Sequence, residues 1–181
     1  MFQFTKVQLL LFGLIALTLG GCLKTDQASI IPSIQFISFI RTNAADTAGA
    51  YLTISFKDGD GDIGRLDQSN TNPPYDSASP YRYDLNMIFY GLAKGDNQFR
   101  RYYNPAQNDS FRLGYILPLL PQAVGTNKTL SGQIITHIPF PFYPIGLYPP
   151  VNFTACRFDI YIYDRALHKS NIVSTGPIPL P

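Results

Sequence analysis

The sequence predicts an all-β fold, namely an antiparallel β-sandwich of about seven to eight strands joined by several long loops. Outside an apolar N-terminal stretch, no segment keeps a 3.6-residue apolar period over the length of a normal helix. Aromatic residues are abundant, with twelve Tyr and thirteen Phe, and several runs alternate between apolar and polar residues. Clusters of Pro, Gly, Asn and Asp interrupt these runs, which is typical of antiparallel sandwiches.

Residues 1–21 have the features of a removable signal. The stretch MFQFTK carries one charge, Lys6, and the apolar run VQLLLFGLIALTLG is short for a bilayer span. It ends in LGGC, which resembles the lipobox of bacterial lipoproteins. That resemblance implies cleavage before Cys22 and attachment of Cys22 to a membrane through acyl chains. The alternative is an ordinary secretory signal in which the cysteine is incidental.

The remaining chain has the size of one domain. We expect a short polar tether over residues 22–29 and a single β-sandwich over residues 30–181. The formal net charge is +2, and no basic stripe is present, so a nucleic-acid partner is not expected. If Cys22 carries lipid, Cys156 has no cysteine with which to form an intramolecular disulfide.

The first half of the domain contains three predicted strands. In IIPSIQFISFI, residues 30–40, Ile34, Phe36 and Ser38 are expected on one face and Ile37 and Phe39 on the other. The run AYLTISF alternates cleanly and predicts a half-buried strand. Its inward residues are Ala50, Leu52, Ile54 and Phe56. The third strand lies within YRYDLNMIFYGLA, residues 81–93, with Tyr83, Leu85, Met87 and Phe89 on one face.

The second half shows the same pattern. Residues 111–120 predict a short strand or a turn-rich crossover, and residues 129–140 predict a strand. The segment FTACRFDIYIYD alternates most clearly of all. Its expected inward residues are Cys156, Phe158, Ile160 and Ile162, and its expected outward residues are Arg157, Asp159, Tyr161 and Tyr163. RALHKS then turns the chain, and NIVSTGPIP closes the sheet.

Two resemblances refine this prediction. The closing hairpin FDIYIYDRALHKSNIVST resembles the last two strands of bacterial Ig-like and fibronectin-type modules. Together with FKDGDGDIG and the lipobox, it resembles surface lipoproteins of Bacteroidetes-type bacteria. The resemblance implies an Ig-like sandwich in the cell envelope, lipid-anchored to the outer membrane. The loops at 65–80 and 139–150 are longer than the usual connections of such modules.

The stretch FKDGDGDIG, residues 56–64, is the main candidate site, because Asp58, Asp60 and Asp62 crowd three carboxylates together. Calcium binds six to eight oxygens, and alternating Asp-Gly lets side-chain and carbonyl oxygens converge. The stretch is not an EF-hand, since Ser69 stands where that loop needs Glu. In an Ig-like strand order the last hairpin lies at the same end, which would bring Asp164 close. We therefore predict calcium held by these four aspartates.

Asp67 is a further candidate oxygen ligand for that site. The alternative for the whole stretch is a solvated turn in which Asp side chains cap backbone amides.

A second candidate is the Pro-aromatic stretch over residues 138–153. Phe140, Phe142, Tyr143 and Tyr148 are predicted to form a binding surface for a glycan, a peptide or an envelope protein. The alternative is that these rings cover one open end of the sandwich.

Signals of catalysis are weak. His137 and His168 show no zinc-type spacing, and no G-x-S-x-G elbow is present. His137 is expected to be an ordinary sheet residue, His168 to lie in solvent, and Cys156 to be an inert core thiol. The predicted function is a lipid-anchored, calcium-stabilised binding or structural module of the cell envelope without catalytic activity. The alternative is an envelope hydrolase or a glycan-processing accessory protein.

Overall fold

The computed structural model describes residues 28–42, 49–104, 109–121, 127–139 and 153–180. These residues form strands, turns and irregular connections, and the described part contains no helix. The strands are β1 (Ser33–Thr42), β2 (Gly49–Asp58), β3 (Leu85–Ala93), β4 (Arg100–Arg101), β5 (Tyr103–Asn104), β6 (Asp109–Ser110), β7 (Arg112–Tyr115), β8 (Leu130–Pro139), β9 (Phe153–Ile162), β10 (Val173–Ser174) and β11 (Ile178–Pro179).

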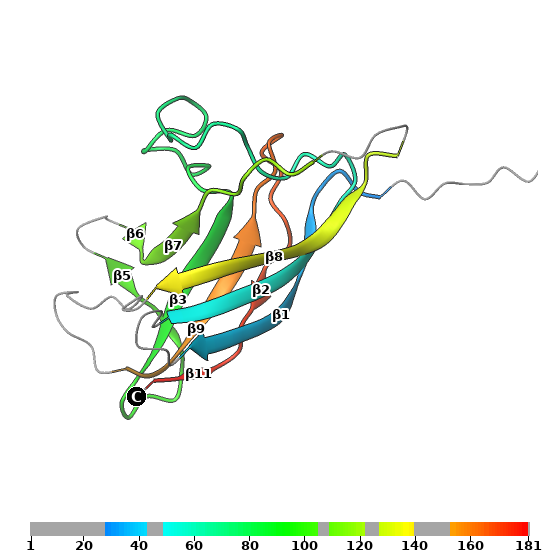
Figure 1. The fold of residues 1–181 in the computed structure, drawn as a ribbon. Helices are drawn as coiled ribbons and strands as arrows, with labels where there is room; N and C mark the ends of the chain where they lie inside the picture. The colour runs from blue at the N-terminus through cyan, green and yellow to red at the C-terminus, as the bar shows by residue number, and fades with distance from the viewer. Residues whose placement is uncertain (1–27, 43–48, 105–108, 122–126, 140–152, 181) are drawn as a thin grey trace, which may run out of the picture.

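The strands form two antiparallel sheets that face each other (Figure 1). One sheet has the order β1-β2-β8. The other has the order β10-β9-β3-β4, with β11 also paired to β9 and β7 to β3, while β5 and β6 form a separate two-stranded sheet. The predicted all-β antiparallel sandwich is confirmed. The two main sheets contain three and six described strands, slightly more than expected, because several edge strands are only two to four residues long.

The core lies between the two sheets and follows the predicted alternation. On β2 and β9 the expected inward residues are buried, and the same holds for β3 from Leu85 onward. Phe158 of β9 stacks on Phe39 of β1 across the interior, with ring centroids 6.0 Å apart. Cys156 is fully buried in this core and burial raises the pKa of its thiol to about 12, so the expectation of an unreactive thiol agrees with its surroundings.

A β-bulge makes one of the predicted strand faces wrong. The register of β1 against β2 shifts between Phe36 and Ser38, so Ile37 is an extra residue. As a result Phe36 and Phe39 both pack against the core, whereas Ile37 is 45% exposed. Simple alternation placed Phe39 on the opposite face from Phe36, because a pattern of period two does not reveal an inserted residue.

Tyr161 was predicted to point outward from its strand. Only 6% of its surface is exposed, although it does not point between the sheets. The ring packs edge-on against Tyr163, with centroids 5.5 Å apart, and the Lys169 ammonium lies 4.0 Å from its centre. Neighbouring side chains therefore cover this residue on the outer face of its sheet.

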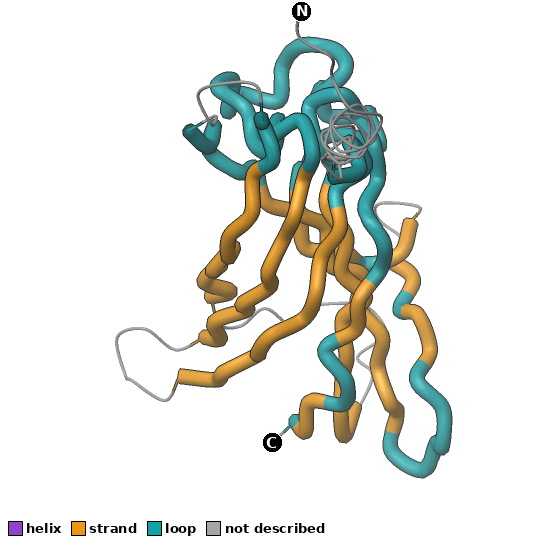
Figure 2. Tube along the Cα trace, turned by 90° about the vertical axis from the view of Figure 1, so that its right-hand side faces the viewer, coloured by secondary structure: helices purple, strands orange, loops and turns teal. Residues whose placement is uncertain are grey.

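Most of the described loop residues gather at one end of the sandwich (Figure 2). The long connection between β2 and β3, residues 59–84, lies there, and so does the hairpin that follows β9. The end of the chain that follows β11 lies at the opposite end. No helix in the described part is long and apolar enough to span a bilayer. The predicted ligand-binding residues Phe140, Phe142, Tyr143 and Tyr148, like Cys22, lie outside the described residues.

Candidate metal centre

Three of the four predicted metal ligands meet at the loop-rich end. Asp58 is the last residue of β2, Asp62 lies in the following loop, and Asp164 follows β9 by two positions. One carboxylate oxygen from each lies within 4.8 Å of the others. The predicted approach of the last hairpin to the aspartate loop is therefore present. The centre joins two segments that are about a hundred residues apart and belong to opposite sheets.

Hydrogen bonds hold the aspartate loop in this shape. The Asp62 amide donates to Asp58 Oδ2 at 2.8 Å, which closes the turn on itself. The Ala166 amide donates to Asp62 Oδ2 at 3.0 Å, and the Arg165 amide donates to the Asp62 carbonyl at 3.3 Å. Gly61 has φ of 68°, and a Cβ there would collide with the carbonyl oxygen of Lys128. The glycine therefore allows the chain to curl, as the Asp-Gly alternation predicts.

Each carboxylate of this loop keeps an oxygen that no described group satisfies. Oδ1 of Asp58, of Asp60 and of Asp62 is buried and has no hydrogen-bond partner among the described residues. Asp58 has no exposed surface at all. Buried carboxylate oxygens are normally paired, because stripping them of water costs several kcal/mol for a charged group. Three such oxygens in one short loop could accept a cation or protons.

His168 contacts the third candidate ligand, Asp164, through its amide and its ring. Its amide donates to Asp164 Oδ1 at 2.7 Å, and its Nδ1 lies 2.9 Å from Asp164 Oδ2. The expectation that His168 lies in solvent is therefore wrong, because it binds Asp164 and only 35% of its side chain is exposed. A carboxylate oxygen has lone pairs left after accepting one hydrogen bond. Asp164 can thus bind a metal while His168 fixes its orientation.

The carboxylates destabilise one another in their ionised form. Burial, followed by the charges of Asp60, Asp62 and Asp164, raises the pKa of Asp58 to about 7, although the hydrogen bond from the Asp62 amide opposes this. Burial and the charges of Asp164 and Asp60 likewise raise the pKa of Asp62, against the Ala166 hydrogen bond and the Arg165 charge. At neutral pH the centre therefore needs either protons or a cation to relieve the repulsion.

A pH dependence of stability follows when calcium is withheld. The pKa of Asp58 is about 7 in the folded state, against 3.8 for an unperturbed aspartate. Between these two pH values the folded state therefore binds more protons than the unfolded state. Stability must then fall as pH rises from about 4 to about 7, by up to a few kcal/mol at about 1.4 kcal/mol per pKa unit. Urea unfolding in chelator at pH 4.5, 6 and 7.5 measures this. A rise in stability over that range would contradict the arrangement.

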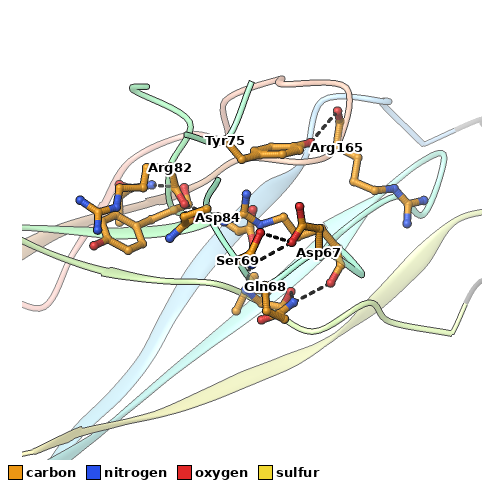
Figure 3. Close-up of polar contacts among 12 residues, drawn as sticks. Asp67, Gln68, Ser69, Tyr75, Arg82, Asp84 and Arg165 are labelled. Atoms are coloured by element: carbon orange, nitrogen blue, oxygen red, sulfur yellow. Dashed lines mark hydrogen bonds and ion pairs between the residues drawn. The ribbon is translucent and has the colours of Figure 1, made fainter. Parts of the chain in front are cut away.

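The other two aspartates of the loop are placed differently. Asp60 is near enough to raise the pKa of Asp58, yet it is not one of the three residues whose oxygens lie within 4.8 Å. Asp67 caps its own turn, accepting hydrogen bonds from the Ser69 amide at 2.8 Å and hydroxyl at 2.6 Å (Figure 3). Asp67 therefore caps a turn, as the solvated-turn alternative predicts. It is not one of the three clustered aspartates.

Sequence reasoning missed a second polar cluster under the long loop. Arg65 is 3% exposed, and its Nε lies 3.3 Å from Asp84 Oδ2. Its Nη2 donates to Asn70 Oδ1 at 2.6 Å and to the Arg82 carbonyl at 2.7 Å, while its guanidinium lies 4.3 Å from the Tyr75 ring centre. No pattern in the sequence distinguishes these residues from ordinary polar loop residues. These contacts join residues of the 65–84 segment to one another and so fix the shape of the loop between β2 and β3.

Tyr75 connects the long loop to the metal centre. Its hydroxyl donates to the Arg165 carbonyl at 3.3 Å, while the Arg165 side chain points away from the ring (Figure 3). The residue after Asp164 is thus bonded to both the aspartate loop and the 65–84 segment. Asp84 also accepts a hydrogen bond from the Leu117 amide at 2.8 Å.

Two surface grooves lie away from the centre. One, of about 560 Å³, runs between β1 and residues 175–179, and the other, of about 440 Å³, between residues 115–120 and β8. The described residues that line them include no carboxylate, although His137 borders the second. The rings of His137 and Tyr51 are tilted against each other with centroids 5.0 Å apart, which agrees with the expected role of a sheet residue.

Comparisons with protein-family models, curated proteins and solved structures found no match for this chain.

Proposed function

We propose that this chain is a lipid-anchored module of the cell envelope with a binding or structural role, whose β-sandwich is stabilised by one calcium ion. The ion is held by Asp58, Asp62 and Asp164, with Asp60 as an additional ligand. The observation that supports the calcium site is the fully buried Asp58, whose Oδ1 has no partner within the described part of the chain and lies beside two other carboxylates.

The donor set favours calcium over other metals. The three clustered residues offer only carboxylate oxygens, and no Cys or His is among them. Zinc prefers nitrogen and sulfur ligands, whereas calcium takes oxygens in a flexible geometry. Magnesium needs a near-ideal octahedron at short distances and keeps several waters. A loop of alternating Asp and Gly with spare carboxylate oxygens suits the larger and less demanding ion.

The position of the centre supports a stabilising role. Asp58 ends a strand of the three-stranded sheet, and Asp164 follows a strand of the six-stranded sheet. An ion between them cross-links the two sheets at their loop-rich end. Because Arg165 also binds the aspartate loop and Tyr75, the same ion secures the connection between β2 and β3.

Calorimetric titration with calcium tests the metal proposal. We expect the chain from residue 23, which retains every described strand, to bind one equivalent. Asp58→Asn should weaken binding at least tenfold, because it removes a charged ligand that has no substitute. The control Asp96→Asn alters an aspartate that pairs with Arg100 on the surface and should leave the isotherm unchanged. Equal heats from wild type and Asp58→Asn, or no heat from either, would overturn the proposal.

Metabolic labelling with a fatty acid tests the anchor. Expressed in a lipoprotein-processing bacterium, the full chain should incorporate label and fractionate with membranes, since Cys22 supplies the thiol for the acyl chains. Cys22→Ser should remove both properties, while Cys156→Ser, which changes only the buried cysteine, should keep them. Label retained in Cys22→Ser would contradict the anchor.

A further inference from the structure

We propose that calcium at this centre also fixes the point where the tether enters the domain, so that the ion controls how rigidly the module is held on its anchor. The proposal rests on the metal site described above and assigns it a second role.

The chain that leads into β1 is bonded directly to the aspartate loop. The amide of Gly59 donates to the carbonyl of Ser29 at 2.8 Å. A Cβ on Gly59 would collide with the carbonyl oxygens of Ala28 and Ser29, so only glycine permits this approach. Gly59 stands between Asp58 and Asp60, each of which has a buried oxygen without a partner among the described residues. The hydrogen bond to Ser29 therefore comes from the backbone between two of the crowded carboxylates.

The same segment is held a second time by the last hairpin. The Ile34 amide donates to Asn171 Oδ1 at 2.8 Å, and Asn171 Nδ2 donates to the Ile34 carbonyl at 2.9 Å. The neighbouring Ser170 is bonded to Ile162 by its amide and its hydroxyl, each at 3.0 Å. The entry segment 28–34 is thus attached to the aspartate loop through Gly59 and, through Asn171, to the chain that follows Asp164.

Electrostatics makes this attachment depend on the ion. Without a cation, the clustered carboxylates repel one another, which weakens the arrangement that their close approach requires. With calcium bound, the loop is fixed by several oxygens at once, and the Gly59–Ser29 hydrogen bond persists. Cys22 precedes Ala28 by six positions, a reach of at most about 20 Å in an extended chain. A fixed Ala28 therefore restricts the orientations of the whole module relative to its lipid.

Fluorescence anisotropy at Ile30 tests this inference. Ile30 is 53% exposed and adjoins Ser29, so Ile30→Cys in the chain from residue 23 accepts a dye. The buried Cys156 thiol, with its pKa raised to about 12, stays unlabelled. We expect calcium to raise the anisotropy, chelator to reverse it, and the midpoint to match the calorimetric affinity. Calcium heat without an anisotropy change would overturn this inference and leave the metal site intact, whereas absence of heat would overturn both.

The variant Gly59→Ala tests whether calcium acts on the tether through the Gly59–Ser29 hydrogen bond. Gly59→Ala keeps every carboxylate but displaces Ala28 and Ser29, so calcium should still bind while the anisotropy response is lost. Gly95→Ala is the control for backbone strain, because the φ of 86° at Gly95 also disfavours alanine although a Cβ there meets nothing within 4 Å, and it should respond like wild type. The anisotropy of the labelled Ile30→Cys chain, compared with and without calcium, decides the proposal without this variant. A full response in Gly59→Ala would overturn the route through Ser29.

Discussion

Removal of calcium is expected to lower the melting temperature of the domain by about 5–10 °C at neutral pH. A ligand at a hundred times its dissociation constant stabilises the folded state by about 2.7 kcal/mol. For a domain of this size each kcal/mol corresponds to about 2–4 °C. Calcium bound as proposed would connect the two sheets and would relieve the repulsion that, together with burial, raises the pKa of Asp58 and Asp62. Differential scanning calorimetry in calcium and in chelator measures it.

Two controls separate this from a general salt effect. Magnesium at the same concentration should restore much less of the melting temperature, because magnesium needs near-ideal octahedral geometry and gives up its water ligands reluctantly. Asp58→Asn should keep no more than about half of the calcium-dependent shift, because a tenfold weaker affinity leaves about 1.4 of the 2.7 kcal/mol. If Asp58→Asn kept the full calcium-dependent rise in melting temperature, or if the wild type showed no rise, the role given to Asp58 would be contradicted.

Replacement of Arg65 by Met is expected to lower the free energy of unfolding by about 3–5 kcal/mol at pH 8. The two side chains of the Arg65–Asp84 pair are only 4% and 5% exposed, so the substitution leaves a buried carboxylate without its counter-charge. It also removes the hydrogen bonds to Asn70 and to the Arg82 carbonyl. The loop between β2 and β3 would lose its main polar attachment. Urea unfolding of the calcium-bound proteins measures the change.

Arg100→Met is the matched control, because Arg100 pairs with Asp96 at 3.0 Å on the surface with 70% of its side chain exposed. Such pairs contribute roughly 0–1 kcal/mol. The loss in Arg65→Met should also shrink at pH 5, since burial already raises the pKa of Asp84 to about 6 and protonation removes the unpaired charge. Equal losses in the two variants, or a loss that does not depend on pH, would contradict a buried ion pair.

The strand pattern was predictable because burial on a sheet has a period of two. Leu52 and Ile54 on β2, and Phe158 and Ile160 on β9, are buried as alternation requires. The face of Phe39 was not predictable, since a bulge inserts one residue without any change in composition.

The candidate site was predictable only where topology determined proximity. Asp164 was expected near the aspartate loop because the connection after the second strand and the last hairpin share one end of an Ig-like sandwich. The contacts of His168, Arg65 and Asp84 depend on side-chain packing between segments distant in sequence, and no local pattern encodes them. The lipid anchor at Cys22 and the binding surface at Phe140, Phe142, Tyr143 and Tyr148 stay predictions.

Anomalous scattering from a crystal of the chain grown with calcium would locate the ion. We expect a single peak between Asp58, Asp62 and Asp164, about 2.3–2.6 Å from their carboxylate oxygens. Oδ1 of Asp58 and Oδ1 of Asp62, which have no partner among the residues described, should be among the ligands. An empty cluster at millimolar calcium, or a peak at another group of carboxylates, would contradict it.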